Sequence, residues 1–271
     1  MSDAWFANKL APDGAIEDGC HPAEAEALKQ YLRGATTAAE AALAISRPIA
    51  HASRNPRDEV SRLWDLLIDA LLELPADTTT EPLIALIQAL ENLPEPESKL
   101  RWRGLPGFGH LYADIHQSGD WRAAALRAPD AGERSRLRAY HVRKAAVEAR
   151  LAAAGLAGIP IDWGYETVAD ALESSSSAAV LDFEVPAAAE WLRIAGARFR
   201  EGAARGEASW ALARKRDLWA EGEGGGGEVM TEQRYEFWRG RLEELRSQAE
   251  VTLRAAEAAL RAMGEGEGEG V

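Results

Sequence analysis

Residues 61–74 read SRLWDLLIDALLEL, and this segment sets the architecture expected for the whole chain. Its apolar residues recur at spacings of three and four, the period of an α-helix with one buried face. The apolar face comprises Leu63, Trp64, Leu67, Ile68, Leu71 and Leu72, and the opposite face carries Arg62, Asp65, Asp69 and Glu73. Asn55-Pro56 is a typical helix opening, and Pro75 is expected to end the helix.

A second amphipathic helix follows after a short connection. Thr80-Glu81-Pro82 is expected to start this helix, whose body reads LIALIQALENL and ends before Pro94. Because the connection is short, the two helices are predicted to form an antiparallel pair.

Two further helices are predicted upstream of this pair. Thr37 and Glu40 form a capping box before the sequence AALAIS, a helix that Pro48 is expected to end. A weaker helix, AEAEALKQYL, follows His21-Pro22.

The second half of the chain has the same helical period. Residues 132–156 predict a long basic helix ended by Gly155 and Gly158, and residues 185–203 predict another, with Pro186 in its first turn. Thr231 is expected to cap a helix that reaches Met263. The seam of this last helix comprises Tyr235, Trp238, Leu242, Leu245, Ala249, Ala256 and Met263.

No segment alternates apolar and polar residues long enough to predict a strand. The sequence therefore predicts an all-α fold, a single helical domain of about eight to eleven helices with a long C-terminal helix. Residues 1–20 are predicted to be a flexible N-terminal segment, and residues 21–263 to be the helical domain. Within that domain, residues 221–228, EGEGGGGE, are expected to form a mobile loop, and residues 264–271 a disordered acidic tail.

The charge of the chain restricts its partners. The 271 residues include 44 acidic and 31 basic side chains, which gives a net charge of −13. This charge repels phosphate backbones and anionic lipid, so we expect no nucleic-acid partner and no membrane partner. The N-terminal residues do not read as a secretory signal, and no apolar run reaches the length of a bilayer span. We expect a cytoplasmic protein, with the nucleus left open.

A search for catalytic and metal-binding patterns finds no strong motif. The sequence contains no GxSxG, GxxxxGK[ST] or HExxH pattern. Asp65 and Asp69 could hold a divalent cation, but their polar helix face favours a solvated stripe. His110 and Asp114 could form a general base with its carboxylate, or the histidine could simply pack near a glycine-rich loop.

Two other candidates are weaker still. His141 lies among basic residues that could receive an anion, although a basic helix face that balances an acidic protein is the favoured explanation. Cys20 is the only cysteine, which excludes a disulfide scaffold, and it is expected to be exposed and not catalytic. We therefore predict no metal and no cofactor.

Aromatic residues are the most unusual feature of the composition, with nine tryptophans in the chain. Large aromatic side chains could line a pocket for an apolar ligand. The candidate pocket residues are Trp64, His110, Trp191, Tyr235 and Trp238. The alternative is that the tryptophans are core anchors that fill volume in an alanine-rich bundle.

Several of these aromatic segments resemble a known family. Leu63-Trp64, Trp191-Leu192, Leu218-Trp219 and the segment from Tyr235 to Leu242 together resemble the fungal family DUF3632, a domain of unknown function. The resemblance covers residues 55–263. This chain departs from the family in having Tyr235 where Trp is expected, and in the glycine-glutamate insert.

The resemblance implies a soluble, mainly helical fungal protein with no assigned reaction, and it carries over no catalytic residues. Some members lie near genes of secondary metabolism, which implies a link to small molecules. We therefore keep two hypotheses. The first is a non-enzymatic interaction or scaffold protein with an unidentified protein partner, because no convergent catalytic group is visible. The alternative is a helical enzyme or carrier that encloses an apolar small molecule.

Overall fold

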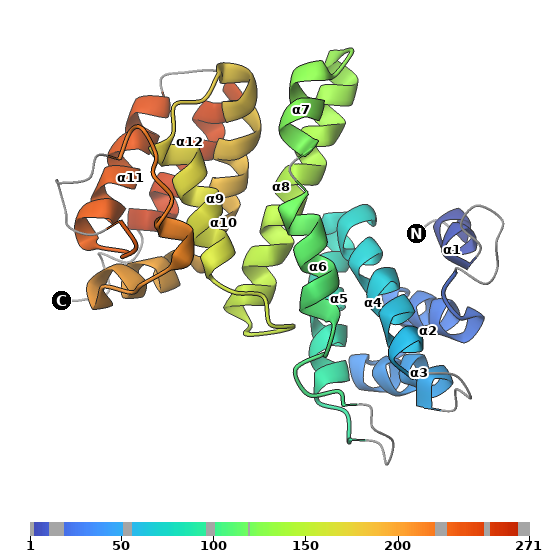
Figure 1. The fold of residues 1–271 in the computed structure, drawn as a ribbon. Helices are drawn as coiled ribbons and strands as arrows, with labels where there is room; N and C mark the ends of the chain where they lie inside the picture. Colours follow the sequence, from blue (N-terminus) through green and yellow to red (C-terminus); the bar gives the residue numbers. More distant parts are fainter. Residues whose placement is uncertain are drawn as a thin grey trace. The chain divides into compact units, whose positions relative to one another are not determined.

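Helices account for nearly all of the regular structure of this chain (Figure 1). The computed structural model describes residues 3–10, 19–50, 56–95, 101–118, 120–219, 227–246 and 250–264. These residues form helices α1 to α12 and a short 3₁₀ helix, with two isolated β-bridges and no longer strand among them. The all-α prediction is confirmed.

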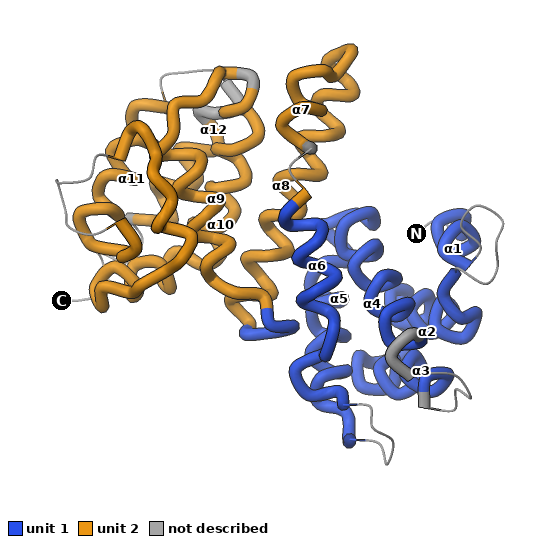
Figure 2. The backbone as a smooth tube through the Cα atoms, viewed as in Figure 1, with its two compact units in different colours: residues 1–117, 155–158 blue, residues 118–154, 159–271 orange. Residues whose placement is uncertain are grey.

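The contacts within the chain group into two compact units (Figure 2). Unit 1 contains residues 1–117 and 155–158, and unit 2 contains residues 118–154 and 159–271. The residues expected to form one helical domain are thus distributed over two units, each with its own buried core.

Unit 1 is built around the amphipathic helix predicted from the sequence. Its helices are α1 (Asp3–Leu10), α2 (Pro22–Leu32), α3 (Ala38–Ala50), α4 (Pro56–Glu73), α5 (Ala76–Glu91) and α6 (Phe108–Gln117). The apolar face of α4 is buried, and α4 contacts α3, α5 and α6. Burial of this face drives the assembly because leucine and tryptophan side chains leave water together.

The ends of these helices test the capping predictions. The capping box at α3 is confirmed, because the Glu40 amide donates to Thr37 Oγ1 at 3.3 Å and Glu40 Oε2 accepts from the Thr37 amide at 2.8 Å. Helix α5 begins at Ala76, earlier than expected.

The prediction that Pro48 ends α3 is wrong, since the helix continues to Ala50. Pro48 lies in the last turn, where it removes one backbone hydrogen bond, and the next residue, Ile49, is buried.

The N-terminal segment that was predicted to be flexible includes helix α1, which the sequence analysis missed. Phe6 of α1 is buried, and Lys9 Nζ lies 2.7 Å from Asp69 Oδ2 on α4. Trp5 Nε1 also donates to Glu73 Oε2 of α4 at 2.7 Å. The prediction that Cys20 is exposed is wrong as well, since this residue is buried and its amide donates to the Lys9 carbonyl.

Unit 2 is arranged around one long helix. Its helices are α7 (Asp120–Arg127), α8 (Ala131–Ala153), α9 (Asp162–Glu173), α10 (Ala178–Arg205), α11 (Glu232–Leu245) and α12 (Glu250–Gly264), with a 3₁₀ helix at Trp210–Leu212. Helix α10 contacts all five other α-helices of the unit. It begins at Ala178, so Pro186 lies inside it and not in its first turn as predicted.

The long C-terminal helix is not present as one element. Helix α11 ends at Leu245, α12 begins at Glu250, and residues 247–249 lie outside the described part of the chain. The two helices contact each other, and both contact α10. The two halves of one straight helix could not contact each other in this way, so α11 and α12 are separate elements. Of the predicted mobile loop, residues 221–226 lie outside the described residues, as do residues 265–271 of the predicted tail.

A glycine on α9 sets how closely α9 approaches α10. A Cβ atom at Gly164 would lie 2.5 Å from Trp191 Cε3 and 2.7 Å from Phe199 Cζ. Both aromatic side chains are fully buried on α10, so neither has space to move aside. Only glycine fits between these helices at their present separation.

The substitution Gly164→Ala is therefore expected to lower the free energy of unfolding by about 1–3 kcal/mol, because the added methyl group overpacks the core. Gly240→Ala is the matched control, because Gly240 lies within α11 and a Cβ atom there meets nothing within 4 Å. This control should be neutral or stabilising by about 0.5–1 kcal/mol. Urea unfolding of the two variants measures the difference, and equal stabilities would contradict the close packing.

Candidate functional site

The five residues proposed from the sequence as a pocket do not lie in one unit. Trp64 and His110 belong to unit 1, whereas Trp191, Tyr235 and Trp238 belong to unit 2. The sequence did not predict a boundary between the two units, because the amino-acid composition does not change where they meet along the chain.

In unit 1, Trp64 is part of a closely packed aromatic group. It is buried on α4, and its indole Nε1 donates to the carbonyl oxygen of Pro106 at 3.0 Å. The rings of Trp102 and Phe108 meet it edge-on, with centroid distances of 6.3 and 5.6 Å. His110 is exposed near the start of α6 and is not part of this group. Trp64 thus anchors the loop before α6 to α4.

In unit 2, Trp191 and Trp238 lie on either side of Phe199. The ring centroid of Phe199 is 6.3 Å from that of Trp191 and 6.2 Å from that of Trp238. Tyr235 is also buried, and burial raises the pKa of its hydroxyl, partly offset by the nearby Arg200 guanidinium. This arrangement favours the interpretation in which the tryptophans fill the core.

Several side chains of unit 2 bind one buried carboxylate, that of Glu173. This residue was not among the candidates from the sequence. Glu173 lies at the end of α9 and is fully buried. Arg234 of α11 binds it through two parallel hydrogen bonds, from Nε to Oε1 at 2.6 Å and from Nη2 to Oε2 at 2.7 Å. Trp238 Nε1 donates to the same Oε1 at 2.7 Å. Paired hydrogen bonds of this kind are strong because both partners are charged.

Other ion pairs extend this cluster along α9. Arg216 Nη1 lies 3.8 Å from Glu173 Oε2, and Arg216 also binds Asp170 at 2.8 Å. Arg122 then joins Asp170 to Glu184, whose pKa is raised by burial and partly lowered by that arginine. Each of these carboxylates has a cationic neighbour, and the cluster links α9 to α11 and to the segment that contains Arg216.

A local sequence signal for this cluster did exist. Arg234 and Trp238 are four residues apart on α11 and share one helix face, as do Asp170 and Glu173 on α9. Glu173 and Arg234 are 61 positions apart in the sequence, however, and only the fold brings the two faces together.

The carboxylate and cysteine candidates from the sequence, Asp65, Asp69 and Cys20, all lie in unit 1. Burial raises the pKa of both Asp65 and Asp69, and Asp69 is paired with Lys9. No group of three or more His, Cys, Asp or Glu side chains in the described ranges could hold a metal ion. Burial raises the pKa of Cys20 to about 11, which disfavours the reactive thiolate.

His141 is buried and not available to an anion at the surface. Its ring stacks on that of Trp121, with a centroid distance of 4.1 Å. Two of the basic residues near it have carboxylate neighbours, since Arg136 pairs with Glu133 and Lys144 Nζ lies 3.5 Å from Glu148 Oε1. The helix as a whole remains basic, as the sequence predicts.

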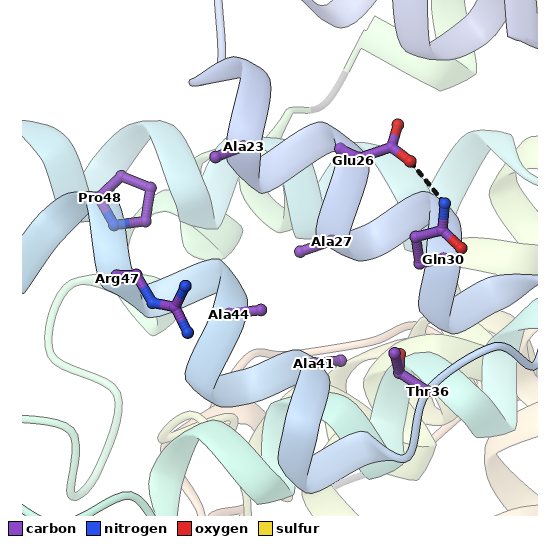
Figure 3. A pocket seen from close by; sticks show the side chains of 9 residues that line it. All are labelled: Ala23, Glu26, Ala27, Gln30, Thr36, Ala41, Ala44, Arg47 and Pro48. Carbon is purple, nitrogen blue, oxygen red and sulfur yellow. Dashed lines mark hydrogen bonds between the residues drawn. The ribbon is translucent and has the colours of Figure 1, made fainter.

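One hollow lined by described residues is an open groove between α2 and α3 in unit 1, larger than the two hollows described below (Figure 3). Its volume is about 610 Å³. The groove is lined by Ala23, Glu26, Ala27, Gln30, Thr36, Ala41, Ala44, Arg47 and Pro48. Glu26 accepts a hydrogen bond from Gln30 at 2.6 Å on the α2 wall, while the hydroxyl of Thr36 is buried without a partner.

The other two hollows are smaller. One, of about 230 Å³, is lined by residues of the segment from Leu212 to Trp219 and by Gly227. The second, of about 110 Å³, lies beside Lys9, Cys20 and Asp69. None of the three hollows is lined by any of the five pocket candidates. The groove is therefore the candidate functional site. Its open shape suits contact with another molecule more than enclosure of a small ligand.

Comparison with known proteins identifies one family. A family model described as "Protein of unknown function (DUF3632)" matches residues 64–242. No curated protein and no solved structure matches the chain. The matched region includes Trp64 and the residues of the Glu173 cluster. It does not include the residues that line the α2–α3 groove. None of the described helices has the length and apolar content that a membrane span requires.

Replacing the buried carboxylate of Glu173 tests the role of the cluster. Glu173→Gln is expected to lower the free energy of unfolding by about 3 kcal/mol, because it leaves the charge of Arg234 buried without its counter-ion. Glu243→Gln is the matched control, since the Glu243–Arg246 pair is more than half exposed and should contribute less than about 1 kcal/mol. Chemical denaturation monitored by tryptophan fluorescence measures both, and similar small losses would show that the cluster is dispensable.

A second buried carboxylate, Glu24, makes unit 1 sensitive to pH. Burial raises its pKa to about 7, although the His21 amide donates to it at 2.9 Å. In the unfolded chain its pKa is about 4.3. Folding therefore takes up a proton between these values, and the stability of the wild-type chain falls as the pH rises through this window.

Glu24→Gln removes this titration. The free energy of unfolding of Glu24→Gln minus that of the wild type should increase by about 3 kcal/mol from pH 4 to pH 8, because only the wild type must bury a charge. Denaturation curves across this range measure the difference, in which the titration of other groups cancels. A difference that does not vary with pH would contradict the raised pKa.

Proposed function

Because this chain belongs to the DUF3632 family, whose function is unknown, its role must be argued from its own surface, and we propose that it is a non-enzymatic interaction protein. Its contact surface is the groove between α2 and α3. The family match brings no catalytic residues to this chain. We place this function in the cytoplasm, as part of the same proposal.

The open, mainly apolar groove is the observation that carries this proposal. Four alanines line it, two on each helix, so the two helices present a smooth surface of small side chains. An apolar groove between two helices is the shape into which a further helix packs. The polar groups Glu26 and Arg47 lie on opposite walls, where they can select a partner by charge.

The alternative is a helical enzyme or carrier that encloses an apolar metabolite, including one of fungal secondary metabolism. It requires a cavity between aromatic side chains. Trp64, Trp191 and Trp238 are instead fully buried against residues of their own units, and Trp64 and Trp238 have their indole N–H groups hydrogen-bonded. These observations favour the interaction protein.

Affinity capture from an extract of the source cells tests the proposal. Ala27→Arg places a long charged side chain in the groove and should abolish capture of any protein that uses it. Ala153→Arg is the matched control, because Ala153 is an exposed helical alanine of unit 2, and it should capture the same proteins as the wild type. Capture that is unaffected by Ala27→Arg would contradict the proposal, as would a metabolite that co-purifies with both variants in place of a protein.

A further inference from the structure

The α2–α3 hairpin carries a projecting apolar side chain beside its groove. Leu43 of α3 is 55% exposed, and among the described residues it is the only exposed large apolar side chain of unit 1. It adjoins Ala44, which lines the groove, and lies one helical turn from Arg47. A hollow and a projection therefore occupy the same helix pair.

We propose that the groove is covered by a second copy of this chain, in a two-fold symmetric contact. Helix α3 of each copy packs into the α2–α3 groove of the other, so that Leu43 of one copy fills the hollow of its partner. This inference rests on the proposed function, because it identifies the partner of the same groove.

The shape of the hairpin favours a second copy over an unrelated helix. In a two-fold contact, the same patch of both subunits must be self-complementary, with projection and hollow close together. The alanines of α2 and α3 allow a neighbouring helix to approach closely, and a leucine side chain replaces the missing volume. Leu43 and the groove meet this requirement on one pair of helices.

The charges of the hairpin favour the same partner. Residues 22–50 contain three acidic side chains, Glu24, Glu26 and Glu40, and three basic ones, Lys29, Arg33 and Arg47. By formal count the hairpin is neutral, whereas the whole chain has a charge of −13. Lys29 and Arg33 pair with Asp3 of α1, so the charged side chains that line the groove are one acid, Glu26, and one base, Arg47. Two copies repel each other least where the local charge is balanced. Glu26 and Arg47 lie on opposite walls of the groove, so symmetric copies can pair each residue with its opposite.

The mass of the purified chain in solution tests this inference. Sedimentation equilibrium over a range of concentrations should give a mass twice that of the 29.3 kDa chain. Leu43→Glu should weaken the dimer by about 100-fold or more, because it places a charge in the hollow of each partner. Leu126→Glu is the matched control, since Leu126 is 61% exposed on α7 of unit 2, and it should leave the dimer unchanged.

A charge exchange provides a second, independent test. Glu26→Arg and Arg47→Glu should each weaken the dimer by about tenfold or more, and the double variant should recover most of that loss. Circular dichroism confirms that each variant is folded. Because recovery requires the two groups to meet, it supports a contact between these positions even if Leu43→Glu fails to fold.

Two results would overturn the inference. One is a wild-type chain that stays monomeric at every concentration, and the other is a dimer that neither Leu43→Glu nor the charge variants weaken. A monomer whose capture of a different protein is lost in Ala27→Arg would refute the second copy and leave the proposed function standing. A monomer that captures nothing through the groove would refute both.

Discussion

The carboxylate of Glu173 is the group on which the packing of unit 2 depends. It is fully buried, and charged or polar groups from two other parts of the chain bind it, namely Arg216 and, on α11, Arg234 and Trp238. A buried charge is tolerated only when it is paired and hydrogen-bonded, so these partners must be in place for α9 and α11 to pack. The cluster thus explains why the aromatic residue Trp238 is fixed in the core.

The residues buried within each unit differ from those of the α2–α3 hairpin in their contacts. The side chains of Trp64, Trp191 and Trp238 are buried within their own units, and the Glu173 carboxylate is already bound by Arg234 and Trp238. The α2–α3 hairpin is different, because an apolar groove, an exposed leucine and a balanced set of charges lie together there. Surfaces that expose apolar area beside polar side chains are typical of binding sites. The function proposed for the protein therefore lies in the hairpin, outside the region that matches the family.

Local signals in the sequence predicted much of the fold. The period of residues 61–74 and the prolines around it correctly predicted α4, and the capping box at Thr37 correctly predicted the start of α3. The effect of proline was overestimated, since Pro48 and Pro186 both lie inside helices whose buried faces continue past them. The continuous C-terminal helix was not found, because packing against α10 is a property of the tertiary structure.

The α2–α3 groove could not be predicted from the sequence, because it depends on how two helices pack in the tertiary structure. Nothing in the spacing of the alanines indicates that those of α2 and α3 line a groove between these two helices. Large aromatic residues attracted attention instead, although burial is their usual role.

Native mass spectrometry of the purified chain distinguishes a symmetric pair from a carrier, because a single spectrum reports both the number of copies and any retained small molecule. We expect a species of twice the 29.3 kDa chain mass with no added ligand mass. A single chain that carries a bound metabolite would contradict this expectation.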